Sequence, residues 1–153
     1  MAEVYEELAP AVLGYFRGRG AGDPEGLTGD VFVSVTTGLP RFRGNRAALR
    51  RWVFTIAHNR LIDQFRRSSR VAEAAVATMP DSGIEDSLPI DAEILRALSA
   101  LPEGQREVVV LRFVADLPLA DVAKIVGKRS GAVKMAQARA LTSLAATLST
   151  ESD

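Results

Sequence analysis

Apolar side chains recur at intervals of three and four residues along most of this 153-residue chain, and this spacing most constrains the fold. It is the spacing of one face of an α-helix. In the first half it predicts a helix over about residues 4–16, a second between Pro24 and Pro40, and a long third helix that ends at Arg67. No stretch alternates apolar and polar residues over the length of a strand. We therefore predict an all-α fold.

The helical spacing breaks down between residues 68 and 91. This segment contains two prolines, a glycine and five carboxylates but few large apolar side chains, a composition typical of a flexible linker. Helical spacing resumes at Ile94 and continues towards the C-terminus. The sequence therefore predicts two small helical domains, residues 1–67 and 92–153, joined by an acidic flexible linker.

Residues 119–139 have the pattern of a helix-turn-helix. A short helix, a turn centred on Gly127 and a second helix that begins near Ser130 follow one another at the required spacing. The side chains that this unit would direct towards a major groove or nearby phosphates are Lys128, Arg129, Lys134, Gln137 and Arg139. An ordinary helical hairpin in a bundle would have the same spacing, so that alternative stays open.

Charge is distributed in blocks although the net charge of the chain is zero. Residues 41–70 hold nine arginines and one aspartate, a net charge of +8, whereas residues 1–40 carry −4 and residues 71–107 carry −6. Arginines this dense repel one another unless an anion neutralises them. The block favours a nucleic-acid surface, with a solvated helix face as the alternative.

Composition excludes several classes of chemistry. The chain has no cysteine and a single histidine, His58, which leaves no thiolate or histidine pair for a metal ion. We expect no metal, no cofactor and no enzymatic activity, and we interpret His58 as a surface residue. No apolar run approaches the roughly 18 residues that a membrane span requires, and the acidic N-terminal residues do not resemble a signal peptide. We expect a cytoplasmic protein without membrane insertion.

Two stretches resemble one known family. Residues 42–67, FRGNRAALRRWVFTIAHNRLIDQFRR, closely resemble domain two of the extracytoplasmic-function (ECF) sigma factors of bacterial RNA polymerase. Residues 101–139, which begin LPEGQREVVVLRF, are similar to domain four of the same family. The order and spacing of the two stretches agree with the family as well. The resemblance implies an alternative sigma factor that binds RNA polymerase core, recognises promoter DNA and initiates transcription.

The resemblance also implies three sets of binding residues. A loop and the long basic helix would bind the minus-ten element through Gly44, Asn45, Arg46, Trp52, Asn59, Arg60, Asp63, Arg66 and Arg67. The helix-turn-helix region would bind the minus-thirty-five element through Arg112, Lys128, Arg129, Ser130, Lys134, Met135, Ala138 and Arg139. The second helix would dock on the clamp helices of the largest polymerase subunit through Leu27, Asp30, Val31, Phe32 and Val35.

Some of these assignments have structural alternatives. Trp52 is compatible with a core position, and so are Leu27, Val31 and Val35, which share one helical face. Relative to the family pattern the recognition helix lacks two arginines and two hydroxyls, which predicts weaker reading of the minus-thirty-five element because fewer counterions are released. A stand-alone helix-turn-helix regulator and a sigma-like protein-interaction module stay open as other functions.

The family resemblance has two further implications. Its members are usually held by an anti-sigma protein, so we expect such a partner. The 24 residues from Ser68 to Asp91 would reach roughly 80 Å when extended, and promoter elements about 16 base pairs apart are separated by roughly 55 Å. One chain is therefore long enough to contact both elements.

Overall fold

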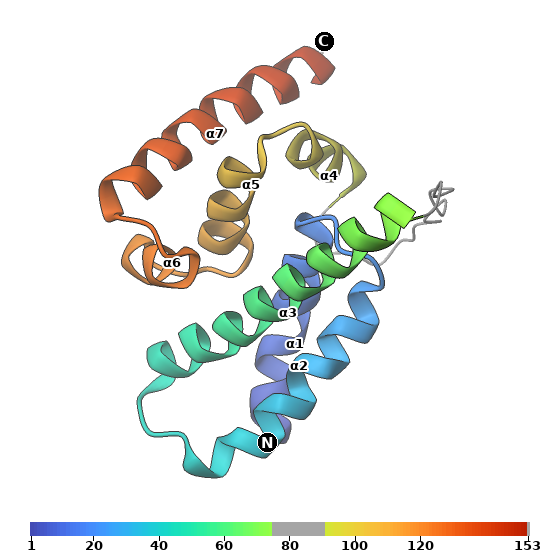
Figure 1. The fold of residues 1–153 in the computed structure, drawn as a ribbon. Helices are drawn as coiled ribbons and strands as arrows, with labels where there is room; N and C mark the ends of the chain where they lie inside the picture. The colour runs from blue at the N-terminus through green and yellow to red at the C-terminus, as the bar shows by residue number, and fades with distance from the viewer. Residues whose placement is uncertain (75–90, 153) are drawn as a thin grey trace.

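The computed structural model describes residues 1–74 and 91–152, and every regular element in those residues is a helix. The prediction of an all-α fold is confirmed. In Figure 1 the first part of the chain, coloured blue to green, lies on one side of the molecule, and the later part, coloured yellow to red, lies on the other. Residues 75–90, which include most of the predicted linker, lie outside the described residues.

Three helices build the first part of the chain: α1 Ala2–Gly18, α2 Pro24–Gly38 and α3 Arg46–Ala74. A side-chain oxygen of Asp23 accepts a hydrogen bond from the backbone N–H of Gly26 at 3.1 Å and so caps α2. After α2, the chain tightens into the 3₁₀ turn Leu39–Arg41, which contains Pro40. Pro24 and Pro40 thus bound the second helix, as predicted.

α3 extends seven residues beyond Arg67, where the linker was predicted to begin. The third helix thus ends later than the sequence predicted, because the serines after Arg67 do not end the helix, and the arginine, alanine and glutamate that follow them favour helical conformation. The 29 residues of α3 make it roughly 43 Å long. α3 therefore offers a long face on which widely spaced side chains align.

The second part of the chain consists of α4 Ala92–Ser99, α5 Glu103–Val109, a π-helical turn Val110–Val114, α6 Leu119–Val126 and α7 Ser130–Ser152. The π turn is closed by a hydrogen bond from the N–H of Ala115 to the carbonyl of Val110 at 3.0 Å. Gly127 has a φ of +71°, a left-handed conformation that ends α6 and turns the chain into α7. The helix-turn-helix lies where the sequence predicted it.

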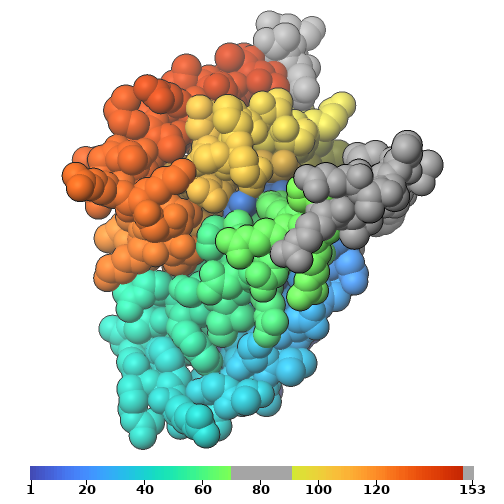
Figure 2. Space-filling model, viewed as in Figure 1, coloured from blue at the N-terminus to red at the C-terminus, as the bar shows by residue number. Residues whose placement is uncertain are grey.

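Buried side chains from both parts of the chain form one continuous core. Tyr15 and Phe54 from the first part, and Val108 and Leu111 from the second, are all fully buried within it. α1 packs against α4 and the π turn, and α3 packs against α6. Figure 2 shows the two parts lying directly against each other. The proposed DNA-binding domains are therefore in contact in this structure.

Candidate nucleic-acid and polymerase interfaces

One exposed face of α3 carries a set of predicted minus-ten residues: Asn59, Arg60, Asp63, Arg66 and Arg67. Their spacing of one, four, seven and eight residues from Asn59 aligns them along the helix. Arg60 donates a hydrogen bond from Nη2 to the hydroxyl of Ser34 on α2 at 2.6 Å. Within the described part of the chain, Arg66 and Arg67 form no ion pair. Two guanidinium groups on this face are thus available to an anion.

The loop before α3 is held in place by contacts with the first turn of that helix. Oδ1 of Asn45 accepts a hydrogen bond from the N–H of Ala48 at 2.9 Å, so Asn45 caps α3. Gly44 has a φ of +149°, and a Cβ there would lie 2.9 Å from the Cβ of Ala48, so a larger residue would displace the loop. Arg46 is exposed, with Nη1 3.8 Å from a carboxylate oxygen of Glu7. The loop therefore presents the Asn45 amide nitrogen and the Arg46 guanidinium.

Trp52 is half-buried and fixes this loop against α2. Its ring stacks on that of Phe42, with centroids 5.2 Å apart and an interplanar angle of 24°. The Trp52 ring also packs closely against Gly38 on α2. A Cβ at that position would lie 2.8 Å from Cζ2 of Trp52, so only glycine leaves room for the ring. The structure thus gives Trp52 a packing position, the alternative that the sequence left open.

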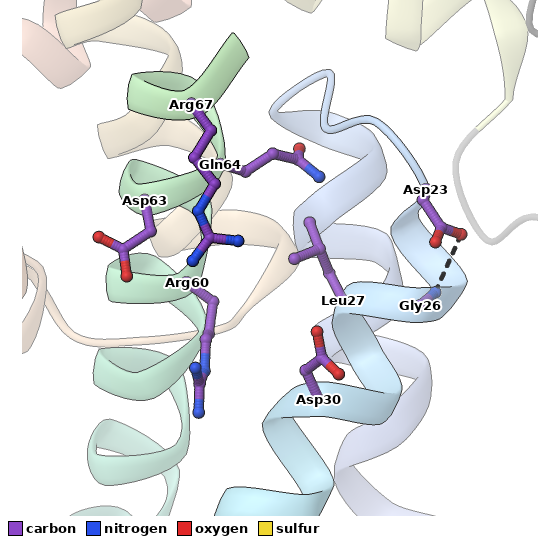
Figure 3. Close-up of a pocket in the computed structure, with 8 residues that line it drawn as sticks. All are labelled: Asp23, Gly26, Leu27, Asp30, Arg60, Asp63, Gln64 and Arg67. Atoms are coloured by element: carbon purple, nitrogen blue, oxygen red, sulfur yellow. Dashed lines mark hydrogen bonds between the residues drawn. The ribbon is translucent and has the colours of Figure 1, made fainter. Parts of the chain in front are cut away.

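α2 and α3 enclose a pocket of about 310 Å³ (Figure 3). Its lining residues come from the start of α2 and the middle of α3: Asp23, Gly26, Leu27, Asp30, Arg60, Asp63, Gln64 and Arg67. Gln64 fixes one end of the pocket through two hydrogen bonds to the backbone of Gly22. Its Oε1 accepts from the N–H of Gly22 at 2.9 Å, and its Nε2 donates to the carbonyl oxygen of Gly22 at 2.7 Å. The pocket brings Asp30, predicted to bind polymerase, beside residues predicted to bind DNA. The two predicted surfaces are therefore contiguous.

Four of the five predicted polymerase contacts are core residues: Leu27, Val31, Phe32 and Val35 are 9%, 0%, 5% and 0% exposed. They pack inwards because they share the apolar face of α2, and only Leu27 and Phe32 reach the surface, each in the lining of a pocket. Asp30 is exposed, and so is Val33, at 68%. Val33 and the half-exposed Tyr5 line a shallow apolar groove between α1 and α2, whose lining also includes Glu6 and Thr36.

Neither groove residue was predicted from the sequence. Val33 falls outside the regular apolar spacing of α2, whereas Tyr5 keeps the spacing of α1, three residues before Leu8, and its exposure follows from how α1 and α2 pack. An apolar residue off that spacing is the sequence signal that identifies an exposed hydrophobic position. Single exposed apolar residues are common on protein surfaces. Two that line one groove are a stronger indication of a contact surface.

His58 lies in a buried polar cluster, so its predicted surface position is wrong. It is 8% exposed, and its Nδ1 lies 3.3 Å from the hydroxyl of Tyr15, which is fully buried. The spacing from Phe54 and Leu61, both fully buried, places His58 on the inner face of α3. Burial, with a smaller contribution from the nearby Arg19 guanidinium, lowers the pKa of His58 from 6.5 to about 4. His58 is therefore neutral at physiological pH.

In the second domain, most of the predicted minus-thirty-five residues are exposed on α7 and the turn before it: Arg129, Ser130, Lys134, Met135, Ala138 and Arg139. Two others are engaged within the domain. Nζ of Lys128 lies 3.5 Å from a carboxylate oxygen of Glu107, and the half-buried Arg112 places its guanidinium carbon 5.1 Å from the ring centroid of Phe113. The start of α7 and the turn before it thus expose three cationic side chains, Arg129, Lys134 and Arg139, with the exposed Met135 directly after Lys134.

The described residues contain no group of three or more histidine, cysteine, aspartate or glutamate side chains arranged to hold a metal ion. Among the helices of the same residues, none is long and apolar enough to cross a membrane.

Two protein-family models match parts of the chain. Residues 4–71 match Sigma-70 region 2, and residues 91–144 match Sigma-70, region 4. The chain is 32% identical over 158 residues to the ECF RNA polymerase sigma factor SigD of Mycobacterium tuberculosis, covering 94% of this chain and 74% of SigD. It is 31% identical to the ECF RNA polymerase sigma factor RpoE of Cereibacter sphaeroides, covering 87% of this chain and 77% of that protein.

Solved structures show the same fold. The sigma factor RpoE of Bartonella quintana, crystallised with the anti-sigma factor NepR, superposes with a TM-score of 0.78 over 97% of this chain and 98% of that chain, at 24% identity. CnrH, solved with the cytosolic domain of CnrY, gives a TM-score of 0.67 over 97% of this chain and 87% of that chain, also at 24% identity. Neither a stand-alone regulator nor a pure interaction module is favoured by these matches. The chain belongs to the ECF sigma factors of RNA polymerase, which are not enzymes themselves, and it is an alternative sigma factor that initiates transcription.

Proposed function

We propose that the exposed face of α3 binds the minus-ten element of the promoter and holds it in the melted state. Opening DNA sacrifices stacking worth about 1.4 kcal/mol per base-pair step, so a protein that melts DNA without fuel must bind the separated strand. Arg66 and Arg67, without ion pairs among the described residues, are suited to the phosphates. Asn59 and Asp63 align with them and carry the amide and carboxylate groups that bind base edges.

The observation that carries this proposal is the alignment, on one solvent-facing side of α3, of Asn59 with two arginines that form no ion pair with any residue the structure describes. Permanganate footprinting of open complexes, formed with core polymerase on a promoter obtained by selection from genomic fragments, tests it. Asn59→Ala should reduce thymine reactivity in the minus-ten region more than Lys134→Ala does, because Lys134 lies on the other domain. Normal melting with Asn59→Ala and lost melting with Lys134→Ala would reverse the roles of the two domains.

We propose that polymerase core docks on the exposed side of α2, through Asp30 and Val33, with Tyr5 of α1 at the edge of the contact. The proposal is supported by the exposure of these residues and by the apolar groove between the two helices. A pull-down of purified core tests it. Asp30→Arg and Val33→Glu should each weaken capture, whereas Ser99→Arg, an exposed change on the second domain, should not. Equal capture by all variants would place the docking surface elsewhere.

The second domain, within residues 92–153, is proposed to bind the minus-thirty-five element through α7. Exposed Lys134 and Arg139 would approach phosphates and bases, while Met135 and Ala138 would make apolar contacts in the major groove. Lys128 is the weakest member of the predicted set, since its ammonium group already faces Glu107. Residues 68–91 would join this domain to the first one, within residues 1–67.

An anti-sigma protein is proposed as a further partner. The support is the likeness in fold to RpoE of Bartonella quintana and to CnrH, which were solved with NepR and with the cytosolic domain of CnrY, respectively. Because RNA polymerase and the chromosome share one compartment in bacteria, the proposed site of action is the cytoplasm.

A further inference from the structure

The loop that leads into α3 carries two exposed arginines, Arg41 and Arg43, on either side of the half-buried Phe42. Neither guanidinium group forms an ion pair with a residue that the structure describes. Nη1 of Arg43 donates a hydrogen bond to the carbonyl of Phe42 at 3.3 Å, which leaves its charge unneutralised. Residues 39–46 contain no aspartate or glutamate. The two cations are therefore available to an anion, and the minus-ten residues predicted from the sequence do not include them.

The backbone of Phe42 directs both arginines to one side of the loop. Phe42 is extended, with a φ of −68° and a ψ of 139°, so the side chains before and after it point to the side opposite its own ring. That ring stacks on Trp52. At about 3.3 Å per extended residue, Arg41 and Arg43 are roughly 7 Å apart along the chain. Two guanidinium groups side by side at this separation can contact neighbouring phosphates of one nucleic-acid strand.

The segment that carries the two arginines is fixed at both ends. On one side, the N–H of Phe42 donates to the carbonyl of Leu39 at 3.0 Å and closes the 3₁₀ turn. On the other side, Asn45 caps α3 through its hydrogen bond with the N–H of Ala48. A segment held in this way loses little conformational freedom when it binds a ligand. The loop therefore presents the arginine pair in position before DNA arrives.

The order of the chain assigns this loop to one end of the minus-ten region. Arg46 begins α3 and Arg66 lies 20 residues later, so the loop is roughly 30 Å from the arginines at the far end of the helix. Figure 1 shows the loop, coloured cyan, beyond the N-terminal end of α3. The domain proposed to bind the minus-thirty-five element follows the C-terminal end of α3, and that element lies upstream. The C-terminal end of α3 should therefore face upstream and the loop downstream.

We propose that Arg41 and Arg43 bind two neighbouring phosphates of the separated DNA strand on the downstream side of the minus-ten element. The inference rests on the proposed function, because it takes the direction of the DNA along α3 from it. Contacts made to a separated strand favour the melted promoter over the closed duplex. The arginine pair thus extends the hold on that strand beyond the end of α3.

Anisotropy titrations of core polymerase loaded with this chain test the pair on fork templates. In these templates the upstream part of a selected promoter is duplex and one strand of the minus-ten region is already single. The short template ends with the minus-ten element, and the long template continues downstream for several nucleotides. The test variant is Arg41→Ala combined with Arg43→Ala. Arg96→Ala, which removes an exposed arginine from α4 of the other domain, is the matched control.

Wild type and Arg96→Ala should bind the long template more tightly than the short one, whereas the double variant should gain little from the extension. On the long template the double variant should reduce the slope of log affinity against log salt by about 1.4 units, because each phosphate of a single strand contributes about 0.7. On the short template the slopes should agree. Uncharged methylphosphonates, placed one at a time in the extension, should weaken binding at two neighbouring positions for wild type and at neither for the double variant.

An equal gain from the extension for wild type and the double variant, with equal salt slopes, would overturn the proposal. Loss of affinity by the double variant on the short template to the same extent would also overturn it, because the pair would then contact DNA upstream of the extension. Failure of the proposed function has a different signature. In that case Arg66→Ala and Asn59→Ala would bind the short template as wild type does, whatever the double variant does on the long one.

Discussion

His58 should make the stability of the first domain depend on pH between about 4 and 6.5. The imidazole is buried against Tyr15 and near the Arg19 guanidinium, and these surroundings lower its pKa from 6.5 to about 4. The unfolded chain therefore binds a proton on His58 at a higher pH than the folded chain does. Below the ordinary pKa of 6.5, protonation of His58 stabilises the unfolded state but not the folded state. The free energy of unfolding therefore falls as pH falls towards about 4.

The loss of unfolding free energy at low pH can be calculated from the shift in the pKa of His58. Each unit of pKa difference corresponds to about 1.4 kcal/mol, so a shift from 6.5 to about 4 removes about 3 kcal/mol once the pH is below the folded value. Between pH of about 7 and about 5, the loss of unfolding free energy should be about 2 kcal/mol. Burial raises the pKa of Glu107, which works in the opposite direction because its contribution to stability is lost as pH rises.

The measurement is urea unfolding followed by circular dichroism at several pH values, for wild type and for His58→Gln. Glutamine does not titrate, and its amide retains a hydrogen-bonding group near Tyr15. Because Glu107 is present in both chains, its contribution cancels in the difference between them. The destabilisation of wild type relative to His58→Gln should grow by about 2 kcal/mol from pH of about 7 to about 5. Parallel pH profiles for the two chains would refute the buried, neutral state of His58.

Other changes have distinct expected outcomes. Leu61→Ala, at a fully buried position, should lower the free energy of unfolding by about 2 to 5 kcal/mol in urea titrations, and a loss under 1 kcal/mol would contradict its core position. Arg66→Ala and Arg67→Ala should each reduce the slope of log affinity against log salt by about one unit in anisotropy titrations of the holoenzyme on promoter DNA; an unchanged slope would remove them from the phosphate contacts. Replacing a thymine by uracil, base by base, should weaken binding at one position of the minus-thirty-five region for wild type, because Met135 is 54% exposed on α7 and suited to a thymine methyl group. Met135→Ala should be insensitive to the same replacement.

The helices were predictable from sequence because local signals determine them. Apolar spacing placed α1 and α2, and Pro24 and Gly127 marked ends that the structure keeps. The serines after Arg67 gave a misleading signal, since an isolated pair of serines costs too little to end a helix that alanine and glutamate continue. The helix-turn-helix was also predictable, because a glycine turn between two short amphipathic helices is a local pattern.

The faces of those helices were harder to predict, because burial depends on how the helices pack together. On α2, the regular spacing that suggested a docking face belongs to the core, which leaves Asp30 and Val33 outside. Polar side chains gave no sequence signal for burial at all. Arg19 and His58 are buried because their partners lie 84 and 43 residues away, on α5 and α1 respectively, and such long-range pairs leave no local pattern.

Run-off transcription with purified core polymerase tests the central claim most directly. Core alone should give no specific transcript on a library of genomic fragments, and core with this chain should give discrete transcripts from a small set of promoters. Asn59→Ala, folded and still able to bind core, should lose those transcripts. If the wild-type chain bound core polymerase but yielded no specific transcript from any fragment, its assignment as an initiating sigma factor would be contradicted.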